Sequence, residues 1–409
     1  MRTASRSSTS SSTTSSTVTS TTISTFRSIA TQKLAGAQKL PRWPFARLGA
    51  HPAVSSTIAI TGGRLTLGGA PYTFVGVNAY EIGTEWGTNA GCGPMESDAE
   101  LDQLFSSLPP NSLVRFWALQ GTIATNVTTH QLDWAALDRV FAIAVAHHQR
   151  LIPVLAGQGN GCDGSHWQDP SWYNGGFQQA FNDPSTTDGR GLTPLSYWDY
   201  IQAVVQRYRS SPALGMWEPI SEAEASTCPQ QFQPTSCEGH QTCPNEVAAA
   251  ASLRHFYDVV GTEIHALDSS HLVEDGLLGS GQCGTTWTDY QYVSSSSGID
   301  VLSYHDYYGS AVIGGDQWNG EAERFAEARA VGKPIIGGEV GIIAGSASGC
   351  TTLQDRADEM RAKVSAQIQA GSSGELIWDW LPSPTTPCTF DTFPGDPLMT
   401  AVRGGLGAF

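Results

Sequence analysis

The sequence predicts an α/β protein, a (β/α)8 TIM barrel that follows an N-terminal β-hairpin and a disordered Ser/Thr-rich segment. Eight short apolar runs alternate with amphipathic helical periods, and this alternation is typical of parallel barrels. The chain has 409 residues, of which 40% are hydrophobic, enough for one large barrel with insertions. We therefore expect two parts, a low-complexity segment at 1–56 and the barrel at 57–409.

The N-terminal segment has a composition that cannot form a core. Nineteen of its first 25 residues are Ser or Thr, and such a segment buries too little apolar surface to fold. Lys33 and Lys39 interrupt the only candidate for the apolar region of a signal peptide. The composition fits a transit peptide, a glycosylated stalk or a wrongly assigned start codon.

The folded part is expected to begin with a hairpin. Ile58, Ile60, Leu65 and Leu67 alternate around the turn at Gly62-Gly63. The eight strand-like runs that follow are 72–80, 113–119, 151–155, 214–220, 272–278, 301–307, 334–340 and 376–380.

Three of the intervening helices have a clear apolar stripe. The period over 137–148 places a helix there, with Asp133 as its N-cap. Thr193-Pro194 opens a second helix, whose inward positions run from Trp198 to Tyr208. A third stripe covers 353–368.

The charge balance excludes some partners. The net charge is −16, and the first 80 residues hold eight Lys or Arg and no acidic residue, so the remaining 14 basic and all 38 acidic residues lie beyond them. Such an acidic surface repels phosphate backbones, so we expect no nucleic acid partner. No run of about 18 apolar residues occurs, so we expect no membrane partner either. We expect a monomer.

Two of the apolar runs end in acidic motifs, MWEPISE at 216–222 and IIGGEVG at 335–341. In barrel enzymes the active site lies at the C-terminal ends of the strands, so Glu222 and Glu339 would face each other across the barrel mouth. A glycosidase needs such a pair, one acid to protonate the leaving oxygen and one carboxylate to attack or stabilise the anomeric carbon. With 38 acidic residues, solvated surface carboxylates would give the same spacing.

The residues around this pair resemble glycoside hydrolase family five, the retaining cellulases and β-mannanases of the barrel clan with two catalytic glutamates. The likeness covers roughly Thr57 to the C-terminus and consists of six motifs in the family's order. They are FVGVN at 74–78, LVRFWA at 113–118, WEPISE at 217–222, HDY at 305–307, KPIIGGEVG at 333–341 and GELIW at 374–378.

The resemblance implies a role for each matching residue. Glu222 would be the acid/base and Glu339 the nucleophile of a double displacement. The substrate-binding residues would be Arg115, Ser221, His305, Tyr307 and Trp378. Trp378 would form the floor of the sugar site, and Trp380 is the second candidate for this role. Neither a cofactor nor a metal is expected, and the partner would be a polysaccharide or oligosaccharide.

The acid/base motif departs from the family pattern. Ser221 stands where the family has Asn, and Ala223 where it has Pro. The family Asn hydrogen-bonds the 2-hydroxyl of the sugar that is cleaved, and the shorter Ser would contact it more weakly or through water. We expect Glu222 to have a raised pKa, as a general acid requires. Its neighbour Glu218 is expected to form a structural salt bridge.

The eight cysteines indicate disulfides rather than zinc, because none forms a CxxC pair. The alternative is a set of buried thiols. In the loops above the barrel mouth, Cys92 is expected to pair with Cys162 and Cys350 with Cys388. The other four allow three connectivities: Cys228, Cys237, Cys243 and Cys283. Disulfides form in oxidising compartments, so we expect a secreted protein.

The expected function is that of a retaining glycoside hydrolase that cleaves a β-linked polysaccharide of the β-mannan or β-1,4-glucan type. The alternatives are an exo-β-glycosidase or transglycosylase, and a barrel that binds carbohydrate without cleaving it. Aromatic residues in Gly- and Asn-rich loops are candidate platforms for a glycan: Trp86, Trp167, Trp172, Tyr173, Trp287 and Trp318. The alternative is that half of them only anchor long loops.

Overall fold

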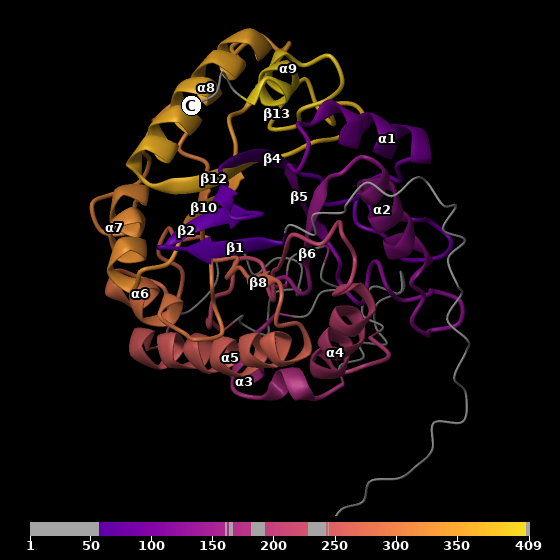
Figure 1. Ribbon diagram of the computed structural model, residues 1–409, viewed down its shortest axis with the longest axis vertical. Helices are drawn as coiled ribbons and strands as arrows, with labels where there is room; N and C mark the ends of the chain where they lie inside the picture. The colour runs from indigo at the N-terminus through magenta and orange to yellow at the C-terminus, as the bar shows by residue number, and fades with distance from the viewer. Residues whose placement is uncertain are drawn as a thin grey trace, which may run out of the picture. The chain divides into compact units, whose positions relative to one another are not determined.

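The computed structural model describes residues 57–159, 162, 167–180, 193–227, 243 and 245–405. The expected disorder of 1–56 lies outside these residues and stays a prediction. Within them, a ring of helices surrounds a barrel of parallel strands (Figure 1). The barrel strands are β4 (Phe74–Asn78), β5 (Leu113–Trp117), β6 (Arg150–Val154), β7 (Met216–Trp217), β8 (Leu272–Val273), β9 (Leu302–Asp306), β10 (Ile335–Val340) and β12 (Ser372–Ile377).

The strand pairing closes the barrel. Six strands form a continuous sheet in the order β6-β5-β4-β12-β10-β9, in which β12 pairs in parallel with β4. The two-stranded sheet β7-β8 fills the remaining gap, through bridges such as Val154 to Glu218 on one side and Glu274 to Val301 on the other. The (β/α)8 prediction is therefore confirmed, and each of the eight apolar runs contains or overlaps a barrel strand. The last run begins too late, because β12 starts at Ser372.

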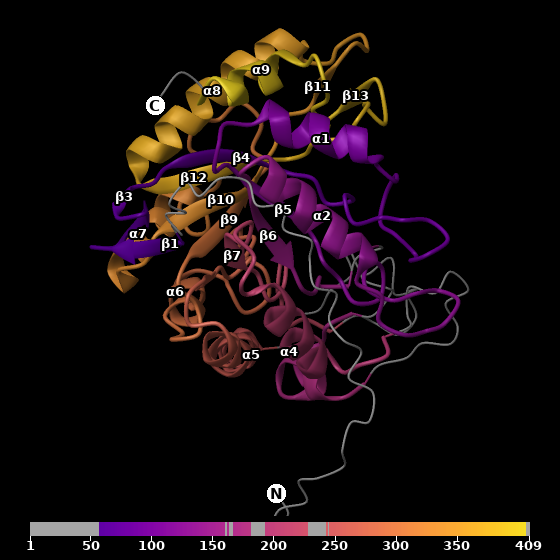
Figure 2. The ribbon, with the colours of Figure 1, turned by 45° about the vertical axis from the view of Figure 1, so that its right-hand side comes forward.

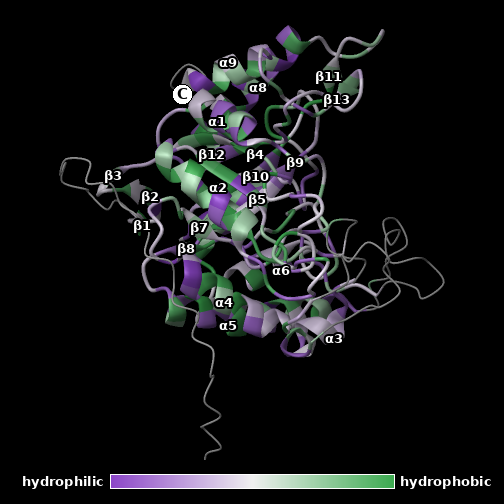
Figure 3. Ribbon diagram, turned by 90° about the vertical axis from the view of Figure 1, so that its right-hand side faces the viewer, coloured by the Kyte–Doolittle hydropathy of each residue, from purple (hydrophilic) through white to green (hydrophobic). Residues whose placement is uncertain are grey.

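The helices pack around the strands and carry apolar residues on one side and polar residues on the other (Figure 3). They are α1 (Asp98–Ser107), α2 (Ala135–Ala146), α3 (Pro170–Tyr173), η1 (Gly176–Gln178), α4 (Tyr197–Tyr208), α5 (Glu246–Leu267), α6 (Thr288–Ser294), α7 (Glu321–Val331), α8 (Leu353–Ala370) and α9 (Pro397–Arg403). In the part of the chain that the structure describes, none of these helices is long and apolar enough to cross a bilayer.

Two predicted helix starts were wrong by a few residues. Trp134, not Asp133, occupies the N-cap position of α2, although the Asp133 carboxylate accepts a hydrogen bond from the Ala135 N–H at 3.1 Å. The helix predicted to open at Thr193-Pro194 begins later, as α4 starts at Tyr197. Its N-cap is Ser196, whose hydroxyl accepts from the Asp199 N–H at 3.1 Å and so satisfies a free N–H of the first turn.

The predicted hairpin is confirmed as β1 (Ile58–Thr61) and β2 (Arg64–Leu67), followed by β3 (Ala70–Pro71). Ile58 and Leu65 are buried in an apolar layer with residues from around the barrel: Phe74, Leu113, Ile152, Met216, Val301, Ile336 and Leu376. The hairpin lies at one end of the barrel, and the short pair β11 (Ala344–Gly345) and β13 (Cys388–Thr389) lies at the other (Figure 2). Apolar packing thus seals the end that is remote from the strand C-termini.

Disulfides hold the loops at the open end. Cys92 is bonded to Cys162 and Cys350 to Cys388, as expected. A third bond joins Cys243 to Cys283. Cys228 and Cys237 lie outside the described residues.

Candidate active site

The C-terminal ends of the barrel strands bring the predicted catalytic residues together. Glu339 lies in β10 and His305 in β9, while Glu222 follows β7. One carboxylate oxygen of each glutamate and one ring nitrogen of His305 lie within 4.8 Å of one another. The strand order therefore gathers residues that are more than 100 positions apart in the sequence.

Arg115, at the centre of β5, organises the base of the site. Its Nε and Nη2 donate to the two oxygens of Glu218 at 2.5 and 2.6 Å, which confirms the structural salt bridge expected of Glu218. Its Nη1 donates to Glu339 Oε1 at 2.6 Å and to Asn78 Oδ1 at 2.9 Å, and Nη2 also donates to Ser221 Oγ at 2.7 Å. Such a fully buried, bidentate arrangement fixes the guanidinium and, through it, one oxygen of Glu339.

Glu339 has a donor at each carboxylate oxygen. Arg115 donates to Oε1, and the Tyr307 hydroxyl donates to Oε2 at 2.5 Å. Burial raises the pKa of Glu339, and the charges of His305 and Arg115 and the Tyr307 hydrogen bond oppose that rise without cancelling it. The carboxylate is thus held in one orientation in a nearly dry environment.

Glu222 lies at the rim, with 40% of its side chain exposed. Its backbone has φ +56°, and its N–H donates to the Gly276 carbonyl at 2.7 Å. A Cβ at Gly276 would lie 2.2 Å from the Ile220 carbonyl oxygen, so this close approach of two chain segments requires glycine. The loop after β8 thereby supports the backbone of the acid/base candidate.

The expected rise in the pKa of Glu222 was wrong. Burial does raise it, but the hydrogen bond from His305 Nδ1 at 2.8 Å, the charge of His305 and that of Arg115 together lower the pKa below its ordinary value. The pKa of His305 is raised, because the charges of Glu339 and Glu222 and the hydrogen bond outweigh the opposing effect of burial. Of the two groups, the His305 imidazole rather than the Glu222 carboxylate therefore favours the bound proton.

The residue predicted to form the floor of the sugar site lies among other aromatic rings. Trp378 is half-buried and stacks on Tyr80, with ring centroids 5.6 Å apart and an interplanar angle of 12°. Trp117 lies beside it at 6.1 Å. Trp380, the second candidate, is only 1% exposed and belongs to the core, so it has no surface to offer a ligand.

Known proteins with similar sequences share one enzyme name, mannan endo-1,4-β-mannosidase. The chain is 26% identical over 328 residues to a probable mannan endo-1,4-β-mannosidase F of Aspergillus flavus, and the match covers 72% of this chain. It spans only 62% of the length of that relative. It is also 24% identical to mannan endo-1,4-β-mannosidase A of Hypocrea jecorina, with 80% of this chain and 71% of the relative covered. No protein-family model matches the chain.

Solved structures extend the comparison. The endo-1,4-β-mannanase of Rhizomucor miehei superposes with a TM-score of 0.58 at 18% identity, covering 87% of this chain and 100% of that one. A glycoside hydrolase family 5 mannosidase of the same organism gives a TM-score of 0.55 at 14% identity, covering 87% and 98%. The resemblance to glycoside hydrolase family five is confirmed. At these identities the structural likeness shows the shared barrel fold.

Sequence reasoning about this family-five-like site missed two residues. Asn78 ends β4, accepts from Arg115 and donates its amide to the Gly338 carbonyl at 2.9 Å, which links β4, β5 and β10. Tyr80, two residues later, forms the stack with Trp378. Both lie at the C-terminal end of the predicted run 72–80, and the ends of such runs are also the signal that identified the glutamates.

The six loop aromatics fall into three groups by their exposure. Trp172 and Tyr173 are buried and pack against Phe256 of α5, so the expectation that they form a platform was wrong. Trp167 is half-buried, and its indole N–H donates to the Ser226 carbonyl at 3.0 Å. Three remain exposed: Trp86, Trp287 and Trp318.

A cavity of about 300 Å³ adjoins the nucleophile candidate. Tyr307 and Gly341, which lies two residues after Glu339, form part of its wall, together with Ile342, Phe390 and Glu359. The Tyr307 ring packs edge-on against Phe390, with centroids 5.1 Å apart. The open end of the barrel is therefore hollowed beside the catalytic candidates.

Proposed function

We propose that this protein is a retaining glycoside hydrolase that cleaves β-1,4-linked mannan inside the chain by double displacement. The observation that carries the proposal is the meeting of Glu222, His305 and Glu339, with one ligating atom of each within 4.8 Å of the others. Retaining enzymes hold their two carboxyl groups about 5–5.5 Å apart, because the second attacks the sugar directly, whereas inverting enzymes leave room for water at about 6.5–9.5 Å. The close approach favours retention.

In the first step, a Glu339 oxygen attacks the anomeric carbon while the bond to the leaving oxygen breaks. Glu222 delivers a proton to that oxygen, which leaves as a free hydroxyl. In the second step, Glu222 takes a proton from water, and the resulting nucleophile displaces Glu339 with the same configuration as the substrate. Arg115 and Tyr307 hold the attacking carboxylate in place throughout.

One proton shared by Glu222 and His305 accounts for the lowered pKa of Glu222. In the free protein the negative charge of Glu339 is the largest cause that favours a proton on His305, so the imidazole stores the proton that Glu222 delivers. When Glu339 becomes an ester, that charge disappears and the pKa of His305 falls. His305 is then neutral and Glu222 ionised, the state that a general base requires.

The substrate assignment comes from the relatives, which are named as mannan endo-1,4-β-mannosidases. A neutral glycan suits an acidic surface and an aromatic floor. The disulfides Cys92–Cys162, Cys243–Cys283 and Cys350–Cys388 favour action outside the cell. We keep a β-1,4-glucan as the second candidate because the departure at Ser221 lies next to the acid/base.

A panel of substrates tests the proposal. Purified protein is incubated with mannan, cellulose and xylan, and the products are sized. We expect mannan to be cleaved fastest, with mixed oligosaccharides at early times. Release of single sugars alone would indicate exo action, and glycan binding without cleavage of any substrate would favour the non-catalytic alternative.

A further inference from the structure

Two large indoles are exposed side by side on loops at the open end of the barrel. Trp287 precedes α6 in the connection from β8, and Trp318 lies in the connection from β9 to α7. Their rings stack with centroids 5.4 Å apart and an interplanar angle of 29°, and the two residues are 57% and 52% exposed. Adjacent exposed indoles are unusual on a soluble surface and mark an interaction site.

The backbone that presents Trp287 is strained and specifically supported. Its φ of +50° lies in the left-handed region that bulky residues avoid. Its N–H donates to Asn319 Oδ1 at 2.9 Å, and its carbonyl accepts from Arg324 Nη1 at 3.1 Å. Arg324 is fully buried and also donates to the Gly279 carbonyl at 2.6 Å. Such strain persists only where surrounding contacts impose it, which is typical of functional loops.

The support for Trp318 comes from the same cluster. The Asp316 carboxylate accepts hydrogen bonds from the N–H groups of Trp318 and Asn319 at 2.6 and 2.7 Å. Asn319 Oδ1 also accepts from Arg324 Nη2 at 3.1 Å. Asn319 therefore fixes the backbones of both tryptophans relative to each other.

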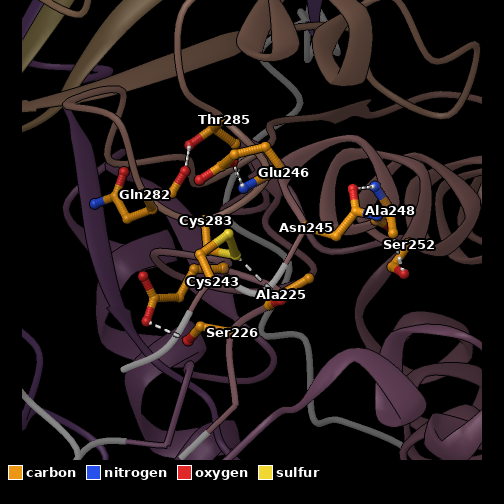
Figure 4. Close-up of a disulfide and its surroundings, with 12 residues drawn as sticks. Ala225, Ser226, Cys243, Asn245, Glu246, Ala248, Ser252, Gln282, Cys283 and Thr285 are labelled. Atoms are coloured by element: carbon orange, nitrogen blue, oxygen red, sulfur yellow. Dashed lines mark hydrogen bonds between the residues drawn. A yellow bond between two sulfur atoms is a disulfide. The ribbon is translucent and has the colours of Figure 1, made fainter. Parts of the chain in front are cut away.

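Both loops are also tied to the catalytic residues. The loop that carries Trp287 begins beside His305, whose N–H donates to the Leu278 carbonyl at 2.9 Å. In the middle of this loop, Cys283 is bonded to Cys243, and its carbonyl accepts from the Ala225 N–H at 3.0 Å, three residues beyond Glu222 (Figure 4). The loop that carries Trp318 begins at Tyr307. The pair is thus a rigid extension of the catalytic end.

We propose that Trp287 and Trp318 form an accessory binding site for pyranose units of a neutral β-linked glycan, beyond the units held at Glu222 and Glu339. An indole face stacks on the C–H face of a pyranose, and each ring of the stacked pair has one face that its partner does not cover. The negative charge of the protein disfavours anionic ligands. This inference rests on the proposed function for the identity of the chain.

The test separates binding from cleavage. Glu339→Ala protein, which binds without turnover, is run through native gels that contain galactomannan, and its retardation is compared with that of Glu339→Ala carrying Trp287→Ala and Trp318→Ala. We expect the added changes to weaken retention about tenfold, the size of two aromatic contacts. Tyr292→Ala, which removes an exposed aromatic ring from the neighbouring α6, is the matched control and should retain full binding.

In the active protein, the same two tryptophan changes should raise KM on long mannan and leave kcat/KM on an aryl mannoside unchanged. If retention equals that of the Tyr292→Ala control, the inference is overturned. It is also overturned if the tryptophan changes convert a dimer to a monomer in sedimentation, since the indoles would then cover a second copy. If the double variant does not fold, Trp318→Ala alone, which leaves the strained residue Trp287 in place, decides. Retention of wild-type protein without mannan cleavage would refute the proposed function but leave this site standing.

Discussion

Tyr307→Phe tests how the nucleophile is held. The change removes only the hydroxyl that donates to Glu339 Oε2 at 2.5 Å and keeps the ring contact with Phe390. We therefore expect the fold to be retained. Arg115 would still hold Oε1, so Glu339 would lose one of its two fixed points.

The expected loss follows from the kind of bond removed. A hydrogen bond to a charged group contributes about 1.5–3 kcal/mol, and about 1.4 kcal/mol corresponds to a tenfold change in rate. Glu339 gives up charge as it attacks, so part of that bond weakens in the transition state and less than the full amount affects the rate. We expect kcat/KM on mannan to fall about ten- to thirtyfold.

The pH profile adds a second measurement with a defined sign. The Tyr307 hydrogen bond lowers the pKa of Glu339, so its removal should raise that pKa further. A nucleophile must be ionised, and the acidic limb of kcat/KM should therefore move to higher pH. Tyr308→Phe, which alters a neighbouring exposed hydroxyl, is the control and should leave both rate and limb unchanged. An unaltered acidic limb in Tyr307→Phe would refute the assignment of Glu339 as the group that titrates there.

Changes at three further residues probe other parts of the site. Ser221→Ala should lower kcat/KM by about tenfold if the Ser221 hydroxyl hydrogen-bonds the 2-hydroxyl of the sugar. The ratio of mannoside to glucoside activity, measured in Ser221→Ala and Ser221→Asn, tests this contact. An unchanged ratio in both variants would mean that other residues determine the choice of substrate. Glu222→Ala should lose most activity on mannan but far less on aryl mannosides with good leaving groups, and equal losses on both would remove it as the acid. Arg115→Met should destabilise the protein by about 3–5 kcal/mol in urea unfolding, because the buried Glu218 loses its partner; a loss below about 1 kcal/mol would contradict this cause.

The barrel could be predicted because parallel strands buried on both faces are continuous apolar runs. The two glutamates could be located because a barrel confines its chemistry to the strand ends, as the positions of Glu222 and Glu339 illustrate. The burial of Trp172 and Tyr173 could not be predicted, because the short α3 that carries them has no periodicity and packs on Phe256, more than 80 positions away.

The protonation states of the site residues could not be predicted from the sequence. The pKa of Glu222 depends on a hydrogen bond from His305, 83 positions away, whose geometry only the folded barrel fixes. The Ser221 hydroxyl could be recognised as a departure from the family, yet its bond to Arg115 Nη2 depends on the guanidinium being anchored by Glu218. Local patterns identify such residues, while their protonation and orientation follow from contacts between strands.

The stereochemistry of the first product tests the central claim most directly. Proton NMR of a mannan oligosaccharide during the first minutes of cleavage shows the anomeric configuration of the new reducing end before it equilibrates. Double displacement by Glu339 with Glu222 as acid and base predicts that the β-anomer appears first. Initial formation of the α-anomer would mean that water attacks the substrate directly, and it would contradict a covalent role for Glu339.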